Sequence, residues 1–153
     1  MDEPDCNQVA FHTSNTPNLL ALGTRKTGKS LCMRWDVIIR CLTFPGFKAL
    51  IIRRKLTDLR KSHLIFIGAE AKKVGANYRQ TTLDVIFTHP GQADSIIQFS
   101  HCENDSDLNN YLTSEWDYIG FDELSTFTLE QFLKICAASS SAPDKPYTSL
   151  IRA

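Results

Sequence analysis

The sequence predicts an α/β fold of three layers, in which helices cover both faces of a mostly parallel sheet. Two observations predict it. Short, almost continuous apolar runs, typical of strands buried on both faces, alternate with helical patterns along the chain. Before the third of these strands, two β-rich runs at residues 82–87 and 95–99 flank a turn, which predicts an inserted antiparallel β-hairpin. The chain has 153 residues, so a single domain is expected.

Each element has its own signal in the sequence. Apolar runs predict parallel strands at residues 19–22, 48–53, 117–121 and 147–151. Helices are predicted at residues 31–40, 57–74 and 128–138. Thr57 is the expected N-cap of the second helix, and Gly75 is expected to end it. Thr128 and Gln131 match a capping box at the start of the third helix.

Composition excludes several classes of protein. Seventeen basic residues balance 17 acidic ones, so the net charge gives no indication of nucleic-acid binding. No apolar run approaches the roughly 18 residues that a membrane span needs, and the acidic N-terminus lacks the pattern of a signal peptide. We therefore expect a cytoplasmic protein. The 5 cysteines include no C-x-x-C pair, which favours reduced thiols over disulfides or a zinc site.

A phosphate-binding loop is the strongest motif in the chain. Residues 23–30 match the Walker A pattern G-x-x-x-x-G-K-[ST], between a predicted strand and a predicted helix, as the motif requires. Its glycines let successive N–H groups point at one spot, and the helix N-terminus adds positive charge there. Lys29 supplies a charge for the outer phosphates, and the Ser30 hydroxyl is a ligand for Mg²⁺. The predicted nucleotide-binding residues are Gly23, Thr24, Arg25, Lys26, Thr27, Gly28, Lys29 and Ser30.

An acidic pair, with the character of a Walker B motif, indicates hydrolysis. Asp122 and Glu123 directly follow the third predicted strand, where a metal-binding carboxylate is expected beside the strand that precedes the loop. Asp122 is therefore predicted to bind magnesium together with Ser30. Glu123 is predicted to orient and deprotonate the attacking water. The alternative is an exposed pair at a helix start, which the intact upstream loop disfavours.

Other candidate side chains have two readings each. Arg25 either stabilises the negative charge that develops on the γ-phosphate or faces solvent. The basic cluster at residues 53–55 either contacts phosphate or a nucleic-acid backbone, or forms a solvated helix start. Phe11 and His12 either pack on an adenine ring or, as we favour, lie in a satellite of the core.

Together these segments resemble the ATPase domain of phage terminase large subunits, the motors that pump DNA into procapsids. Residues 22–30, 49–54 and 118–128 carry the resemblance, whose blocks span residues 19–153. It implies a RecA-like (ASCE) P-loop NTPase fold that binds ATP and Mg²⁺ and hydrolyses the β–γ phosphoanhydride. It also implies partners: double-stranded DNA, further subunits in a homo-oligomeric ring on a portal, and a small terminase subunit. The expected location is the cytoplasm of the infected host cell, away from membranes.

The resemblance also assigns roles to individual residues. Lys29 matches the lysine that contacts phosphates, and Ser30 and Asp122 match the residues that serve magnesium. Glu123 matches the residue that activates water, and Arg25 matches a loop arginine that senses or stabilises the γ-phosphate. The catalytic residues that it implies are therefore Glu123, Lys29 and Arg25.

Two departures from the family pattern qualify this expectation. Many members carry arginines where residues 136–141 of this chain contain no basic residue. The chain also ends where a coupling segment and the last strands are expected, and no nuclease domain follows. We therefore expect residues 1–153 to be the N-terminal part of an ATPase domain, truncated at its C-terminus. Two other functions stay open: a helicase-like DNA translocase, and a nucleotide-binding fragment without turnover, since four core strands are predicted where about five are usual.

Overall fold

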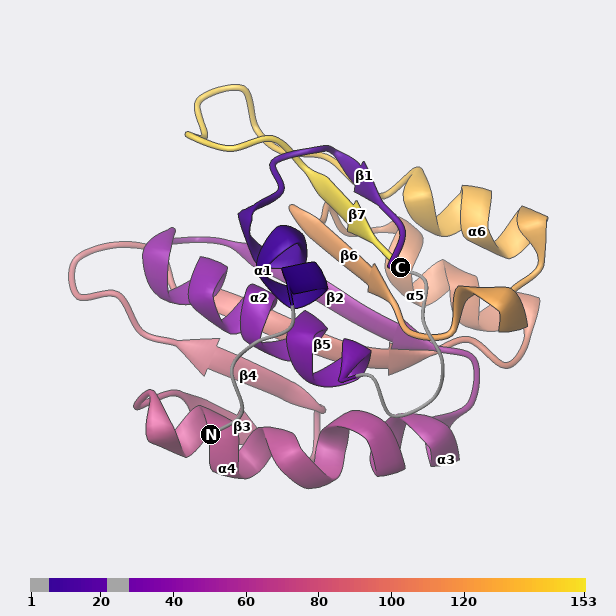
Figure 1. Ribbon diagram of the computed structural model, residues 1–153, viewed down its shortest axis with the longest axis horizontal. Helices are drawn as coiled ribbons and strands as arrows, with labels where there is room; N and C mark the ends of the chain where they lie inside the picture. Colours follow the sequence, from indigo (N-terminus) through magenta and orange to yellow (C-terminus); the bar gives the residue numbers. More distant parts are fainter. Residues whose placement is uncertain (1–5, 22–27) are drawn as a thin grey trace.

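A mixed sheet in the order β1-β7-β6-β2-β5-β4-β3 forms the middle layer of the molecule (Figure 1). The computed structural model describes residues 6–21 and 28–153. In this sheet order, β1, β7, β6, β2 and β5 run parallel to their neighbours. Strand β4 is antiparallel to both β5 and β3. The mostly parallel sheet and the β4–β5 hairpin are therefore as predicted. The strands are β1 (Asn18–Leu19), β2 (Lys48–Arg53), β3 (Asn77–Arg79), β4 (Asp84–Phe87), β5 (Ser95–His101), β6 (Tyr118–Phe121) and β7 (Leu150–Arg152).

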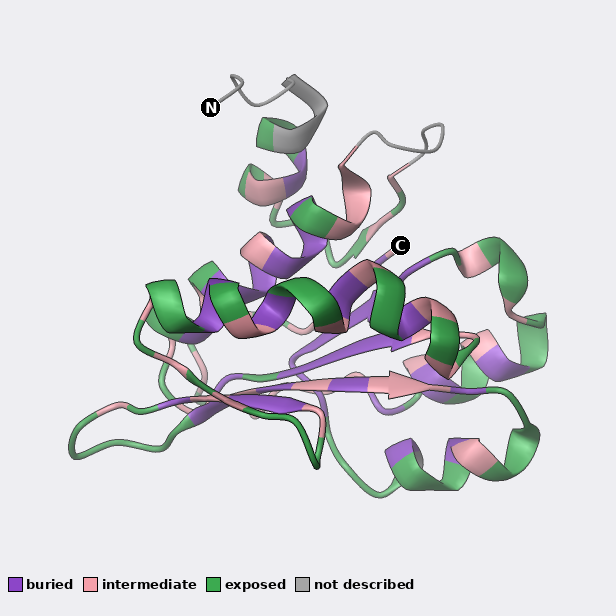
Figure 2. Ribbon diagram, turned by 90° about the horizontal axis from the view of Figure 1, so that it is seen from below, coloured by how far each residue is buried: buried purple, intermediate pink, exposed green. Residues whose placement is uncertain are grey.

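Helices cover both faces of this sheet, which confirms the predicted three layers (Figure 2). On one face, α2, α3 and α4 pack on the larger part of the core. On the other face, η2, α5 and α6 pack on the smaller part. The helical segments are α1 (Cys6–Thr13), α2 (Lys29–Thr43), α3 (Leu56–Leu59), η1 (Arg60–Leu64), α4 (Ile65–Lys73), η2 (Asp105–Leu108), α5 (Asn109–Leu112), η3 (Leu124–Thr126) and α6 (Leu129–Cys136). No helix within residues 6–21 and 28–153 has the length and apolar character that a membrane crossing requires.

Strand β2 contributes side chains to the core on both faces of the sheet. Ala49 and Ile51 point into the core under α2, whereas Leu50 and Ile52 point into the core under α6. Because successive side chains of a strand alternate between its faces, a strand buried on both sides must be apolar at every position. The next strand, β6, approaches α2 closely: a Cβ at Gly120 would lie 2.7 Å from the Met33 sulfur. Glycine at this position thus allows the contact.

The order of the strands corrects one expectation and adds to another. The strand that carries the acidic pair was expected beside the strand that precedes the phosphate loop, but β7 lies between β1 and β6. The hairpin was expected as an insertion or edge, yet its second strand, β5, also pairs in parallel with β2. Ile97 and Phe99 of β5 are fully or almost fully buried, as expected for a strand in the interior of the sheet. With β5, the parallel part of the described sheet has five strands instead of the four predicted.

The helix after β2 differs from the expected single α-helix. Its N-cap is Lys55, not Thr57, and one turn of π-helix, η1, joins α3 to α4. A π turn is a rare local widening that often lies at functional sites. The helix ends as predicted before Gly75, whose φ of 74° is a conformation that favours glycine. The predicted capping box between Thr128 and Gln131 is also confirmed.

Candidate active site

The predicted site residues that the structure describes lie at the carboxyl edge of the parallel strands. This edge is where ligands bind in open α/β sheets. Gly28, with φ at 74°, is the N-cap of α2, and Lys29 and Ser30 form the first turn of that helix. The first N–H groups of a helix have no intrahelical acceptor, so this turn suits an anion. The predicted residues Gly23, Thr24, Arg25, Lys26 and Thr27 lie outside the described residues.

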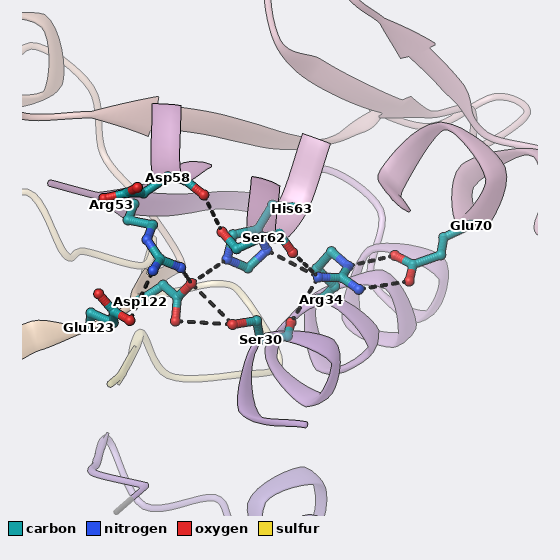
Figure 3. Close-up of polar contacts among 9 residues, drawn as sticks. All are labelled: Ser30, Arg34, Arg53, Asp58, Ser62, His63, Glu70, Asp122 and Glu123. Carbon is teal, nitrogen blue, oxygen red and sulfur yellow. Dashed lines mark hydrogen bonds and ion pairs between the residues drawn. The ribbon is translucent and has the colours of Figure 1, made fainter. Parts of the chain in front are cut away.

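Ser30 and Asp122 meet although 92 positions separate them in the chain (Figure 3). The Ser30 hydroxyl donates to the Asp122 carboxylate, with Oγ 3.2 Å from Oδ1 and 3.1 Å from Oδ2. The contact forms because the N-terminus of α2 and the end of β6 lie at the same edge of the sheet. The motif of the loop and the acidic motif thus converge on one point.

The oxygens at this point suit a magnesium ion. Mg²⁺ prefers hard oxygen ligands, and it usually takes only one or two protein ligands beside water and substrate phosphates. Within the described part of the chain, no group of three or more His, Cys, Asp or Glu side chains could hold a metal ion. By their chemistry, the hydroxyl of Ser30 and the carboxylate of Asp122 fit an ion that also takes oxygens from a nucleotide and from water.

Asp122 is held by two further side chains. Arg53 Nη1 lies 2.5 Å from Asp122 Oδ2, and His63 Nε2 lies 2.9 Å from the same oxygen. Burial by itself would raise the pKa of Asp122, but the hydrogen bond from His63, the charge of Arg53 and the Ser30 hydroxyl lower that pKa to about 2. The carboxylate is therefore ionised at neutral pH, as a metal ligand must be.

This lowered pKa predicts a loss of stability in acid. Because the pKa of Asp122 is about 2 in the folded chain and 3.8 ordinarily, the unfolded chain binds more protons as the pH falls through this window. Between about pH 5 and pH 2, we expect the free energy of unfolding to fall by about 2 kcal/mol more in the wild type than in Asp122→Asn. Urea unfolding at several pH values measures this difference. Parallel stability curves for the two proteins would contradict it.

Glu123 lies in a different environment from Asp122. Its side chain is 48% exposed, and its Oε1 lies 2.9 Å from Arg53 Nη2. Its backbone φ of 59° is in the left-handed region, which costs a non-glycine residue about 1–3 kcal/mol. It borders a cleft of about 340 Å³, where water has access to the carboxylate. The other residues that line this cleft are Arg53, Arg54, Lys55, Asp58 and Thr126.

Two arginines of the basic cluster, and Phe11 of the aromatic pair, have partners within the protein. Arg53, with its side chain only 13% exposed, bridges the two acidic residues and is not part of a solvated helix start. Arg54 Nη1 donates to the amide oxygen of Gln131. Phe11 is buried, as a core aromatic would be, and the Arg152 guanidinium lies 6.0 Å from the centre of its ring. The favoured reading of Phe11 as part of the core agrees with this burial.

Sequence reasoning missed three buried polar residues beside this site. His63 is fully buried, and burial lowers its pKa, although Asp122 opposes that effect. Arg34 and Glu70 form a bidentate ion pair, with Nε 2.7 Å from Oε2 and Nη2 3.0 Å from Oε1. No motif marks these residues. One signal was available: Arg34 is a charged residue among the apolar positions of the predicted helix.

Fold and site together define the class of protein. A mostly parallel sheet with a lysine and a serine in the first turn of α2, and an acidic pair at the end of β6, is the architecture of the RecA-like P-loop fold. No protein-family model matches the sequence, and no curated protein sequence matches it. Structural comparison identifies the group of P-loop proteins to which this fold is similar.

Solved structures of phage large terminases have the same fold as this chain. The large terminase of a thermophilic bacteriophage superposes with a TM-score of 0.79 at 14% identity, over 99% of this chain and 39% of that chain. The same phage protein in complex with ATP-gamma-S gives a TM-score of 0.74 at 13% identity, over 96% of this chain and 36% of that chain. The large terminase ATPase domain of Thermus phage P74-26 gives a TM-score of 0.72 at 18% identity, over 99% of this chain and 64% of that chain.

The predicted resemblance to terminase ATPase domains is therefore confirmed at the level of the fold. The chain spans about two fifths of the first of these terminases and about two thirds of the Thermus phage domain. At these identities the likeness establishes architecture, and the roles of individual site residues stay predictions.

Proposed function

We propose that this chain hydrolyses ATP as part of a terminase motor that moves double-stranded DNA into a viral procapsid. The hydrogen bond between Ser30 and Asp122 carries the proposal, because it joins the loop motif to the acidic motif at the ligand-binding edge of the sheet. The fold shared with large terminases supports the choice of motor. The structure of a phage large terminase in complex with ATP-gamma-S supports the choice of nucleotide.

Several groups of the chain would act on the nucleotide. The N–H groups in the first turn of α2 and the Lys29 ammonium would hold the phosphates, and Arg25 would stabilise the charge that develops on the γ-phosphate. Ser30 and Asp122 would hold a magnesium ion, which supplies positive charge at the phosphate oxygens when bound. Positioning and electrostatic stabilisation account for most of the catalysis of phosphoryl transfer, so these contacts are central to the proposed reaction.

Glu123 would serve as the general base. Its half-exposed carboxylate lies next to Asp122 and borders the cleft, so an attacking water can reach it. It would accept the proton of that water as the oxygen attacks the γ-phosphate and ADP leaves with the β-phosphate oxygen. Arg53 contacts both carboxylates and so holds their separation and orientation.

The proposed partners and location follow from the terminase reading. They are double-stranded DNA, further copies of the chain in a ring on a portal, and a small terminase subunit, in the cytoplasm of an infected host cell. Because the chain covers only 39% of the thermophilic bacteriophage terminase, these are proposals about a motor to which the chain would contribute its nucleotide site.

Lys29→Ala should abolish most of the ATP turnover of the chain. Removing one group that stabilises transition-state charge typically lowers kcat by about 10²–10³-fold. Phosphate release from purified protein measures this effect, and Lys72→Ala, which changes an exposed lysine of α4, is the matched control. ATP turnover by Lys29→Ala at the wild-type rate would refute the assignment of Lys29 to the phosphate site. Binding of ATP without any turnover in the wild type would favour the reading as a fragment that only binds nucleotide.

DNA dependence separates the terminase reading from a helicase-like translocase. Stimulation of ATP turnover by duplex DNA, and not by single strands, would support packaging. The opposite preference would favour a helicase-like enzyme on the same fold.

A further inference from the structure

The buried imidazole of His63 has no role in the proposed hydrolysis, yet it contacts the metal carboxylate directly (Figure 3). His63 is fully buried in the π turn η1, and its Nε2 lies 2.9 Å from Asp122 Oδ2. A fully buried polar side chain needs partners, and a histidine offers two distinct nitrogens. The partners of these nitrogens define what the ring can do.

The second nitrogen shows which way the hydrogen bond to Asp122 runs. Nδ1 of His63 lies 3.5 Å from Arg34 Nη1. A guanidinium group has only donors, so Nδ1 presents its lone pair to Arg34 and the ring hydrogen is on Nε2. His63 is therefore a neutral imidazole that donates its Nε2–H to the Asp122 carboxylate. This tautomer leaves the carboxylate as the acceptor, as a metal ligand requires.

A buried ion pair holds the backbone that presents His63. Arg34 Nη1 donates to the Ser62 carbonyl at 2.7 Å, and the same guanidinium is paired with Glu70. The Ser62 hydroxyl in turn donates to the Asp58 carbonyl at 2.8 Å. Both contacts involve Ser62, which directly precedes His63 in the π turn.

We propose that His63 is a positioning residue that fixes the Asp122 carboxylate toward Ser30, so that both oxygens are set for Mg²⁺ before the metal binds. The inference rests on the proposed function and deepens it. Arg53 also contacts Asp122 Oδ2, but the same guanidinium is paired with Glu123 as well. Of the two acidic residues, His63 is paired with Asp122. Mutation of a residue that orients a metal ligand in this way typically lowers the metal affinity about 10- to 100-fold.

Calorimetric titration of ADP with Mg²⁺ and with EDTA tests the proposal without any turnover. The ratio of the two affinities is the magnesium enhancement of binding. We expect His63→Met, which removes the donor, to lower this enhancement about 10- to 100-fold and to leave the affinity in EDTA unchanged. His63→Gln, which returns an N–H donor near the position of Nε2, should restore most of it. His89→Met is the control, because Nε2 of His89 contacts only Cys41 and Ser95 among its hydrogen-bond partners in the described chain.

Four outcomes decide whether the proposal holds. A wild-type magnesium enhancement in His63→Met, together with its loss in Asp122→Asn, would overturn the role of His63 and leave the proposed function standing. An enhancement that Asp122→Asn retains would overturn the metal site and the role of His63 with it. If His63→Met does not fold, His63→Gln is compared with His63→Asn, whose shorter amide falls short of Asp122. Loss of the magnesium enhancement in His63→Asn but not in His63→Gln supports the proposal. Equal enhancement in the two variants overturns it.

Discussion

Replacing Glu123 with glutamine should leave ATP binding intact and lower ATP hydrolysis by about 10²–10⁴-fold, the usual contribution of a general base. The amide has nearly the same shape as the carboxylate but cannot accept a proton from water. Glu123 is half exposed and lies outside the two cores, so the fold has little need of its charge. The expected protein therefore binds nucleotide and does not turn it over.

Two measurements check this result. Equilibrium binding of ATP reports occupancy, and phosphate release under single-turnover conditions reports the chemical step. Glu130→Gln is the matched control, since Glu130 is an exposed glutamate that pairs with Lys134 on α6. Weak ATP binding in Glu123→Gln would show that Glu123 supports the structure of the site instead of the chemistry. Hydrolysis at the wild-type rate would remove it from the mechanism.

Glu70→Ala should lower the free energy of unfolding by about 3–5 kcal/mol, because it leaves the buried Arg34 guanidinium without its counter-charge. The side chains of Arg34 and Glu70 are only 4% and 10% exposed, so water replaces the lost carboxylate poorly. Alanine is the best helix former, so α4 itself loses no helix propensity. Removing both charges in Arg34→Met/Glu70→Met should restore much of the loss, since well-packed apolar residues can replace a buried pair.

An exposed pair in the same protein provides the control. On α6, Lys134 Nζ lies 2.6 Å from Glu130 Oε1, and the side chains of Glu130 and Lys134 are 70% and 46% exposed. Glu130→Ala should cost far less than Glu70→Ala, because solvent screens such a pair. Urea denaturation of both variants against the wild type measures the contrast. Equal losses in Glu70→Ala and Glu130→Ala would refute the structural importance of the buried pair.

Much of the fold could be predicted because its signals are local. The apolar run of β2 predicts its bounds, Lys48–Arg53, and the capping box at Thr128 predicts the start of α6. The β4–β5 hairpin follows from two β-rich runs around a turn. Helix α1 gave no comparable signal, and Thr57 was a wrong cap because the chain turns into the helix at Lys55. The position of a cap or turn depends on few residues, so the helix can start one or two residues from the position that the sequence predicts.

The sequence by itself determined the phosphate-loop motif, the acidic pair and the alternation of strands and helices, because each depends on residues that are neighbours in the chain. Only the tertiary structure decided that β7 lies between β1 and β6, that Arg53 bridges Asp122 and Glu123, and that a π turn aims a buried His63 at Asp122. These features depend on segments that meet across tens of residues. Their energies come from burial and from the pairing of charges away from water, and neither has a period or a spacing that the sequence displays.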